Sequence, residues 1–577
     1  MNGSVKYRFV DWATIELRGG SDLYTTNRET KMWSKGPIKT NGSYSSHKDV
    51  FRETNLSFLL SAGKDQLWGD FGLHGTFGGN LMARHFSSVG VTVSELAVPD
   101  LFSVNNSVGN PALDEGKSDH KINSLYGTLQ ANYAGCLYLD LTGRNDWSST
   151  LSKANRSFFY PSVSTSFIFS DLIREAAGDR ADWLTFGKLR ASYASVGNDM
   201  GPYQLYNTYK ISRDPNGNIV ASKNDILFDE NVKNELINSW EIGLEGKFFD
   251  SRLSFDFAFY KSNAVNQLLN IPINGLEGYK FRKINAGDIE NKGFELMIDA
   301  TPVLTKDFSW GITANLSKNI NTVRELAEGV TQYSLGAFDN ISILAAAGQR
   351  YGAIYGSKFA RVEDKKSPYY GKVIVDDKGV PNAADGQHYL GNQQPDFLLG
   401  LTNTLTYKGL QLSFQIDGRF GGKIYSFTNY ALKKSGRSIL TVGDNGERSD
   451  FVYDGVVKDG DGYKPNDVKI SHQDFWSQLS GKSSGNVGIT EDNLFDATNI
   501  RLRNISLSYT LPGTWLDGTA VRGAKVGLTA NNLWMITSHL NGVDPESVYA
   551  TGSNAVGLEA LAPPTTRSFY INFSINF

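Results

Sequence analysis

The sequence has very little cysteine: Cys136 is the only one among 577 residues. A single cysteine cannot form an internal disulfide, and it excludes any metal cluster built on a Cys-x-x-Cys pair. The seven histidines are scattered and do not show the spacing of a zinc site. The composition therefore predicts no metal centre and no cofactor.

Long apolar runs and an excess of basic charge are also missing. No stretch approaches the roughly 18 consecutive apolar residues that a membrane-spanning helix needs. The first residues, MNGSVKYRFVDW, do not contain the apolar core of a secretion signal. The net charge is -3 and the pI is about 6.2, which argues against nucleic acid as a partner. No catalytic triad, phosphate-binding loop or pair of catalytic carboxylates stands out, so we predict that the chain is not an enzyme.

What the sequence does contain is two-residue alternation of apolar and polar side chains. Glycine is frequent, with 59 residues, and aromatic residues make up 12 % of the chain, a composition that favours strands and turns. The final segment SFYINFSINF alternates Phe and Ile with Ser, Tyr and Asn up to the last residue. This pattern predicts about 16 half-buried strands. They are expected at 5–17, 54–62, 67–78, 123–133, 136–144, 157–170, 184–194, 237–248, 252–261, 292–301, 308–318, 398–407, 410–420, 500–511, 522–533 and 566–577.

The connections between these strands alternate between two sizes. Short ones are expected at 64–66, 134–135, 249–251 and 408–409, and medium ones at 171–183 and 512–521. Long ones are expected at 18–53, 79–122, 195–236, 262–291, 319–397, 421–499 and 534–565, with 145–156 as the shortest of this group. Membrane barrels sort their connections in this way, with short periplasmic turns and long extracellular loops. We therefore predict an all-β fold, an antiparallel transmembrane β-barrel in an outer membrane.

The ends of the strands support the same prediction. Trp147, Trp183, Trp240, Trp310 and Trp534 are expected near strand termini, where barrels carry aromatic girdles. The last strand has an apolar face that includes Phe569, Phe573 and Phe577. It suits a strand that closes a barrel, because an open sheet edge is not viable in lipid. These three residues also resemble the C-terminal signal that the bacterial outer-membrane assembly machinery reads. Counting connections back from this end places both termini in the periplasm.

Charged residues on the polar faces of the strands are expected to face the lumen. They serve either plug docking and substrate passage or, as we favour, a solvated and mutually paired wall. The set comprises Asp140, Arg144, Lys188, Arg190, Glu241, Glu245, Asp256, Glu295, Asp299, Asp417 and Arg419.

The long connections contain many aromatic side chains, which stack on sugar rings, and long loops often carry binding function. The substrate-binding candidates are Tyr333, Tyr351, Tyr355, Tyr369, Tyr370, Tyr425, Tyr430 and Trp476, with Tyr453 and Tyr463 in the same loops. Loop packing and contact with a lid protein are the alternatives. One loop, VDDKGVPNAADG (375–386), is a weak calcium candidate through Asp376, Asp377 and Asp385, but it lacks the full series of oxygen ligands.

Several stretches resemble one family, the SusC/RagA-like TonB-dependent transporters of the Bacteroidetes outer membrane. Their order and number carry the resemblance, which extends from about the first third of the chain to its end. The stretches are WLTFGKLRASYASVGND (183–199), NSWEIGLEGKFFDSRLSFDFAFYKSN (238–263), INAGDIENKGFELMI (284–298), YLGNQQPDFLLGLTNTLTYKGLQLSFQIDGRFGGKIY (389–425), NIRLRNISLSYTLP (499–512) and NNLWMITSHLNGVDPES (531–547).

The resemblance implies import of oligosaccharides, or of peptides, through a plugged barrel of about 22 strands. It also implies a SusD-like surface lipoprotein as a lid and energy from the TonB complex, which acts on a segment before the plug. The plug and that segment are not recognised in this sequence. Residues 1–577 are therefore expected to be the C-terminal portion of a receptor barrel, with TonB acting only through a missing N-terminal part.

The sequence is also compatible with other functions. A freestanding porin-like pore fits the size of the barrel, because about 16 strands are enough for a channel. A non-functional fragment is a further possibility. A soluble all-β carbohydrate-binding protein would show the same alternation but would not need detergent.

Overall fold

The computed structural model describes residues 1–577 except 37–39, 215, 484, 541 and 550–551. The chain divides into two compact units. Unit 1 comprises residues 1–168, 190–241 and 263–286, and unit 2 comprises 169–189, 242–262 and 287–577. Strands β8 (Leu184–Asn198), β12 (Glu235–Phe248), β13 (Leu253–Pro272) and β14 (Phe281–Leu304) contribute residues to both.

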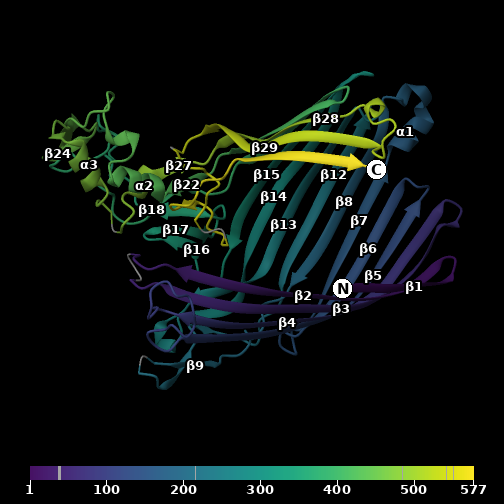
Figure 1. The fold of residues 1–577 in the computed structure, drawn as a ribbon, viewed down its shortest axis with the longest axis horizontal. Coiled ribbons are helices and arrows are strands. Elements are labelled where there is room, and N and C mark those ends of the chain that lie inside the picture. Colours follow the sequence, from purple (N-terminus) through teal and green to yellow (C-terminus); the bar gives the residue numbers. More distant parts are fainter. Residues whose placement is uncertain (37–39, 215, 484, 541, 550–551) are drawn as a thin grey trace. The chain divides into compact units, whose positions relative to one another are not determined.

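Unit 1 is built on an antiparallel sheet in which strands that follow each other in sequence are paired. Figure 1 shows the long strands β2, β3 and β4 running side by side. The strands are β1 (Asn2–Val10), β2 (Ala13–Met32), β3 (Ser43–Trp68), β4 (Phe71–Val93), β5 (Ala112–Tyr133), β6 (Leu137–Ser148) and β7 (Ser157–Ile168). Three short strands, β9 (Tyr209–Arg213), β10 (Ile219–Lys223) and β11 (Ile226–Leu227), lie in the connection after β8.

Unit 2 contains a second antiparallel run, in which β14 pairs with β15 (Phe308–Glu325) and β15 pairs with β20 (Phe397–Tyr407). The run continues through β21 (Leu410–Phe420), β28 (Asn499–Thr510), β29 (Gly523–Ser538) and β31 (Ser568–Asn576). Helix α1 (Ser170–Ala177) and the 3₁₀ turn η1 (Gly178–Ala181) lie in the connection before β8.

The remaining elements of unit 2 form a lobe inserted between these strands. Its helices are α2 (Phe427–Lys434) and α3 (His472–Leu479), which Figure 1 shows close to each other in green. Its strands are β16 (Gln332–Phe338), β17 (Ile341–Ala346), β18 (Ala353–Gly356), β19 (His388–Asn392), β22 (Lys423–Ser426), β23 (Phe451–Val452), β24 (Val456–Asp459), β25 (Gly462–Pro465), β26 (Lys469–Ile470), β27 (Leu494–Asp496) and β30 (Leu558–Glu559). The lobe has apolar cores of its own, one around Ile341, Ile354 and Tyr425 and another around Phe475 and Ile489.

The sheet of unit 2 has one apolar face that continues across strands. One row of paired residues runs from Trp310 through Leu405, Leu412, Leu507 and Leu528 to Ile571. These side chains are exposed where the sheet presents them: Leu507, Leu528 and Ile571 have exposed fractions of 44 %, 57 % and 65 %. An exposed apolar row of this extent is unusual for a protein surface in water and is typical of a surface that faces lipid.

Among the described residues, no helix is both long and apolar enough to cross a membrane.

Most predicted strands are confirmed, and the prediction is close for β20 and β21. Three expected short turns are also confirmed. At Ala134-Gly135 and at Lys408 the backbone has positive φ (51°, 66° and 51°), and positive φ at Phe249, Asp250 and Ser251 marks the third turn. Such left-handed backbone is what tight hairpin connections require.

Two predictions near the N-terminus are wrong. Residues 5–17 form the hairpin of β1 and β2 rather than one strand. Tyr7 pairs with Ile15, and a bulge between Arg8 and Val10 shifts the register before the turn, so apolar residues occupy odd positions in both strands. The alternation therefore runs unbroken through the turn and reads as a single strand. The turn expected at 64–66 lies instead at Gly69-Asp70, between Trp68 and Phe71, where Gly69 adopts a φ of 58°.

The long connections expected at 18–53 and 79–122 are also wrong in extent, because β2 to β5 occupy most of them. Strand β3 has 26 residues, whereas about 9–11 residues span a bilayer as a strand. The additional length carries polar side chains on both faces. Asp49 and Glu53 lie on one face, paired with Arg28 at 3.0 Å and Arg84 at 2.8 Å, and Lys48 and Arg52 lie on the other. Alternation is absent where both faces meet water, so the strands predicted from alternation are shorter than the observed ones.

The tryptophan prediction holds at some strand ends and is wrong at Trp240. Trp147 and Trp310 lie close to the ends of β6 and β15, and Trp183 directly precedes β8. Trp240 lies inside β12, which runs from Glu235 to Phe248.

Candidate functional site

A change of phase in strand β28 sets the position of two arginines. In the segment NIRLRNISLSY (499–509), Ile500 and Leu502 alternate in one phase, whereas Ile505 and Leu507 alternate in the other. The pairing with β21 shifts at the same point: Gln415 lies opposite Asn504, and Ile416 lies opposite Leu502. The extra residue is therefore Arg503, and this bulge keeps the apolar residues on one face. Arg501 consequently lies on the polar face.

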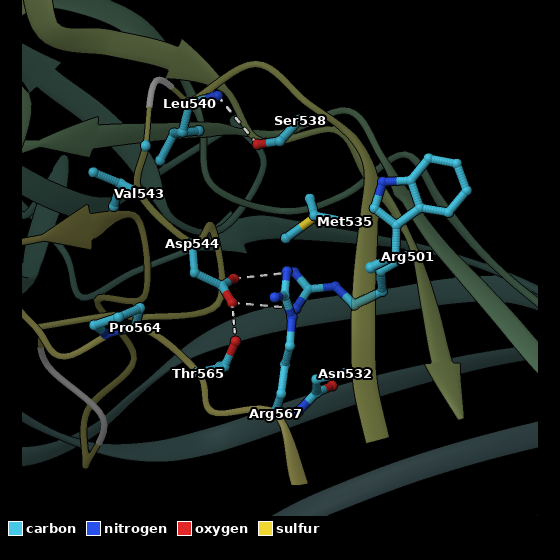
Figure 2. A pocket seen from close by; sticks show the side chains of 12 residues that line it. Arg501, Asn532, Met535, Ser538, Leu540, Val543, Asp544, Pro564, Thr565 and Arg567 are labelled. Atoms are coloured by element: carbon cyan, nitrogen blue, oxygen red, sulfur yellow. Dashed lines mark hydrogen bonds and ion pairs between the residues drawn. The ribbon is translucent and has the colours of Figure 1, made fainter. Parts of the chain in front are cut away.

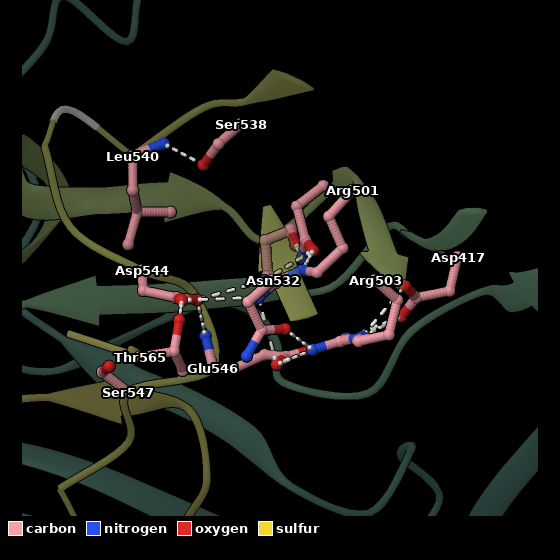
Figure 3. Close-up of polar contacts among 12 residues, drawn as sticks. Asp417, Arg501, Arg503, Asn532, Ser538, Leu540, Asp544, Glu546, Ser547 and Thr565 are labelled. Atoms are coloured by element: carbon pink, nitrogen blue, oxygen red, sulfur yellow. Dashed lines mark hydrogen bonds and ion pairs between the residues drawn. The ribbon is translucent and has the colours of Figure 1, made fainter. Parts of the chain in front are cut away.

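Arg501 forms a buried ion pair with a residue of the connection between β29 and β31. The side chain of Arg501 is 3 % exposed and that of Asp544 is 8 % exposed. The Nη2 of Arg501 lies 3.1 Å from Oδ1 of Asp544, and Nη1 lies 3.3 Å from Oδ2. The Nε and Nη2 atoms of Arg501 also donate to Oδ1 of Asn499. Figure 3 shows these contacts, which fix the connection to the end of the strand.

Arg503 connects the same loop to strand β21. Its Nη2 lies 2.6 Å from Oδ2 of Asp417 and 2.7 Å from Oε1 of Glu546. Its Nη1 donates to Oδ1 of Asn532 at 3.2 Å. Asn532 has a φ of 51° and occupies the irregular part of β29 opposite Arg503, a left-handed position that Asn tolerates better than most residues. We name the set Asp417, Arg501, Arg503, Asp544 and Glu546 the arginine clamp.

The carboxylate at the centre of the clamp is held in its charged form. Burial raises the pKa of Asp544, but hydrogen bonds from Arg501, Thr565 and the backbone N–H of Glu546 outweigh this effect. The net pKa therefore lies below the ordinary value of 3.8. A charged carboxylate with this many donors holds a structure together; it is not poised to exchange protons near neutral pH.

A pocket of about 580 Å³ adjoins the clamp. Figure 2 shows Arg567 and Met535 beside the Arg501–Asp544 pair, with Pro564 and Val543 on the loop side. The lining combines apolar side chains with guanidinium and amide groups. The charges of Arg501 and Asp544, which both line the pocket, neutralise each other. This arrangement can position a loop or hold a polar ligand.

The charged residues expected on the polar faces mostly have partners. Observed contacts are Arg144–Asp146 at 2.9 Å, Lys188–Glu245 at 2.9 Å, Arg190–Glu241 at 3.3 Å, Gln130–Asp140 at 2.6 Å, Thr313–Asp299 at 2.6 Å, Arg503–Asp417 at 2.6 Å and Arg419 to the carbonyl of Gln393 at 2.5 Å. Asp256 is also engaged by a neighbour, and Glu295 lies opposite Ser317 in the register of β14 and β15. This pairing is what a mutually neutralised polar wall requires.

The aromatic candidates fall into buried and accessible groups. Tyr425 is 0 % exposed, and its hydroxyl donates to the carbonyl of Val487 at 2.8 Å. Tyr430 is 4 % exposed. The core of the lobe covers both rings, so these two residues contribute to packing and are not accessible to a ligand. Tyr370 is 55 % exposed, and Tyr333, Tyr351, Tyr355, Tyr369, Tyr453, Tyr463 and Trp476 are half-buried.

The weak calcium candidate is already engaged by the protein itself. Asp376 pairs with Lys482 at 2.5 Å and accepts from the backbone N–H groups of Lys378 and Val380. Asp385 and Asp377 do not join it in a cluster: in the described part of the chain, no three His, Cys, Asp or Glu side chains are gathered to hold a metal ion. These contacts leave Asp376 without the open carboxylate geometry that calcium needs.

The C-terminal residues lie on an exposed strand. Phe569, Phe573 and Phe577 have exposed fractions of 72 %, 75 % and 80 %. Phe569 and Phe573 lie opposite Ala530 and Val526 of β29, and they therefore extend the apolar face described above.

Sequence reasoning predicted Asp417 as a lumen-facing charge but missed the rest of the arginine clamp, although its residues all lie in the stretches 389–425, 499–512 and 531–547. The signal was the break in alternation at Arg503-Asn504, combined with the acidic segment VDPES (543–547). Pairing the two would have required the register of β28 and β29, which no single segment encodes.

Comparisons with known proteins agree with this fold. The family model described as TonB dependent receptor-like, beta-barrel matches residues 3–533. The TonB-dependent receptor P3 of Formosa agariphila is 24 % identical over 484 residues, which cover 79 % of this chain and 45 % of the relative. The TonB-dependent receptor SusC of Bacteroides thetaiotaomicron is 25 % identical over 474 residues, 79 % of this chain and 43 % of SusC. The chain thus spans about half the length of the curated relatives it matches.

Solved structures share the fold. The structure of the RagAB peptide transporter aligns with 100 % of this chain and 61 % of its own, with a TM-score of 0.75 and 18 % identity. The outer membrane transporter YddB from Escherichia coli aligns with a TM-score of 0.51 and 12 % identity, covering 100 % of this chain and 63 % of its own. The SusC/RagA-like resemblance and the all-β barrel fold predicted from the sequence are confirmed. The relatives are named as receptors, in agreement with the prediction of a non-enzymatic protein.

Proposed function

Because this chain belongs to the TonB-dependent receptor-like β-barrel family, we propose that it forms the barrel part of a SusC-like importer in the outer membrane. Residues 1–577 supply the C-terminal portion of the receptor barrel, and TonB acts through the part of the receptor that precedes them. The observation that carries this proposal is the family match over residues 3–533.

In a barrel, the two faces of the sheet contact different surroundings. The apolar row from Trp310 to Ile571 contacts lipid, and the opposite face, with Asp417 and its partners, lines the lumen. Both termini lie in the periplasm, so the connection 539–567 and the lobe lie at the cell surface. The arginine clamp then holds a surface loop against the rim of the lumen.

The cargo is an oligosaccharide, with a peptide as the alternative. The resemblance to the SusC/RagA-like family implies an oligosaccharide, and one structural neighbour is described as a peptide transporter, which supports the alternative. The accessible lobe aromatics Tyr333, Tyr351, Tyr355, Tyr369, Tyr370 and Trp476 contact the cargo or a SusD-like lid lipoprotein. Phe569, Phe573 and Phe577 are read by the outer-membrane assembly machinery.

Purification from native outer membranes tests the partnership. The protein would carry an affinity tag in the loop at Asn445-Gly446, which is exposed. It would be extracted with a mild detergent and captured by this tag. Mass spectrometry should identify one SusD-like lipoprotein in near-equal amount. Recovery of the tagged protein in the soluble fraction, or from membranes with no lipoprotein partner, would contradict the proposal.

A further inference from the structure

The lobe contains a second, smaller pocket that the clamp does not involve. It has a volume of about 310 Å³ and lies between the end of α2, the start of α3 and the segment 435–448. Ligand pockets usually span about 300–1,000 Å³, so this one suits a single terminal unit of a larger molecule. We propose that it binds an acidic sugar unit, carboxylated or sulfated, and it is named the lobe pocket below.

The charge of the lobe pocket carries the first part of this inference. Lys433, Lys434, Arg448 and His472 line it, and no carboxylate does. Lys433 is neutralised, because its Nζ lies 2.9 Å from Oδ2 of Asp492. Lys434 and Arg448 are not neutralised by a carboxylate: in the part of the chain that the structure describes, Lys434 donates to the hydroxyl of Tyr430 and Arg448 donates to the carbonyl of Gly436. An anionic group is the partner that two such cations favour.

Two carboxylates of the segments around the lobe pocket, those of Glu447 and Asp474, are engaged by other groups. The carboxylate of Glu447 accepts from the backbone N–H of Asn445 at 3.0 Å. It is therefore turned back onto its own loop. Asp474, on the first turn of α3, pairs with the hydroxyl of Ser471 at 2.8 Å. The positive lining of the lobe pocket is thus a local property, although the chain as a whole carries a net charge of -3.

The neutral lining indicates a sugar as the bearer of the anion. Trp476 supplies an aromatic ring, and Gln473 and Ser477 supply an amide and a hydroxyl. Aromatic faces together with amide and hydroxyl groups match the ring and hydroxyls of a saccharide.

As an assignment of cargo, this inference rests on the proposed import function. The binding itself does not depend on transport, so the two can be tested separately. The full chain, purified from outer membranes in detergent, would be titrated by calorimetry with trigalacturonate, a sulfated chondroitin disaccharide and neutral maltotriose.

We expect at least one of the two acidic saccharides to bind about tenfold or more tightly than maltotriose, and to bind more weakly as salt rises. Binding of trigalacturonate alone would assign a carboxylate, and binding of the sulfated disaccharide alone would assign a sulfate. The double variant Lys434→Gln/Arg448→Gln should weaken binding about tenfold or more. Both side chains are exposed, so the fold should be retained.

The matched control is Arg437→Gln, which removes one exposed positive charge of the same loop that does not line the lobe pocket. It should leave binding unchanged. Equal binding of maltotriose, or a double variant that binds as tightly as the parent, would overturn the inference. A triglutamate peptide that binds as tightly as the acidic saccharides would overturn the choice of a sugar. None of these results bears on co-purification with the lid lipoprotein, so a failure here is distinct from a failure of the import proposal.

Discussion

At the residue scale, the guanidinium of Arg501 is held by several partners. It is buried, and its hydrogen-bonding capacity is used by Asn499, Asp544 and Glu546. A buried ion pair contributes little net stability over a well-packed apolar pair, but breaking one partner leaves a buried charge without compensation. The clamp is therefore sensitive to the loss of either side alone.

Replacing Arg501 alone tests this sensitivity. Arg501→Met should lower the free energy of unfolding by about 3–5 kcal/mol, because Asp544 stays buried without its cation. The measurement is urea unfolding in lipid vesicles followed by tryptophan fluorescence. The double variant Arg501→Met/Asp544→Leu should recover most of the loss.

The control is Lys372→Gln, which removes an exposed ion pair with Asp454 in the same unit. It should cost less than about 1 kcal/mol. Equal effects of the two single variants would show that burial of Arg501 does not matter.

Acid should loosen the clamp through the same carboxylate. The pKa of Asp544 is depressed in the folded protein, so its contribution is fully present above the ordinary value of 3.8 and is lost as the pH falls through the lower folded value. Limited proteolysis should leave the connection 539–567 intact at pH 5 and cut it increasingly below about pH 4. Cleavage that is unchanged over this range in the parent protein would speak against the clamp as the anchor of this loop.

Sequence reasoning was least successful at this scale. It identified the aromatic residues of the long connections, but it could not separate the ring of Tyr425, which is 0 % exposed, from that of Tyr370, which is 55 % exposed. Burial in the lobe depends on packing between segments that are far apart in the sequence, such as Tyr425 against Ile341 and Leu558. Composition does not encode that packing.

At the element scale, alternation predicts the strands where one face is apolar and fails where neither face is. Strand β21 was predicted at 410–420 and spans Leu410–Phe420, because Leu, Phe and Ile alternate with polar residues through its length. Strand β3 continues far beyond its apolar half to Ser43, and its polar half is held by backbone pairing with β2 and β4. Backbone hydrogen bonds form whatever the polarity of the side chains, so apolar–polar alternation does not reveal them.

A pair of neighbouring substitutions tests which face of β28 contacts lipid. Leu507→Arg places a charge in the apolar row near one end of β28 and should destabilise the barrel by about 1–3 kcal/mol, between the costs of a charge at the interface and at the middle of a bilayer. Ser506→Arg points to the other face, which the account assigns to the lumen, and should cost much less. Unfolding in vesicles measures both. A larger loss for Ser506→Arg would reverse the assignment of the faces.

The last strand should matter for assembly more than for the stability of the assembled protein. Phe573→Asn removes an apolar side chain that lies opposite Val526 and is 75 % exposed. The amount of folded protein in the outer membrane should fall several-fold, as measured by heat-dependent mobility on gels. Ser574→Asn, on the other face of β31, is the matched control and should assemble normally; equal loss in both variants would remove the special role of the phenylalanines.

At the scale of the whole molecule, the chain combines a barrel sheet with a folded lobe. The sheet follows from short-range alternation, so its fold class could be predicted from the sequence. The lobe consists of short strands and two eight-residue helices whose packing is set by contacts distant in sequence, such as the bidentate pair of Arg361 with Glu491. This is why the lobe was predicted only as loops.

The most direct test of the central claim is uptake of fluorescently labelled saccharides by the native cells, measured in the parent, after deletion of the region that encodes residues 1–577, and after depletion of TonB. The account predicts that uptake of at least one saccharide is lost to the same extent in both altered strains. Uptake that requires residues 1–577 but persists without TonB would contradict it and would identify a passive pore.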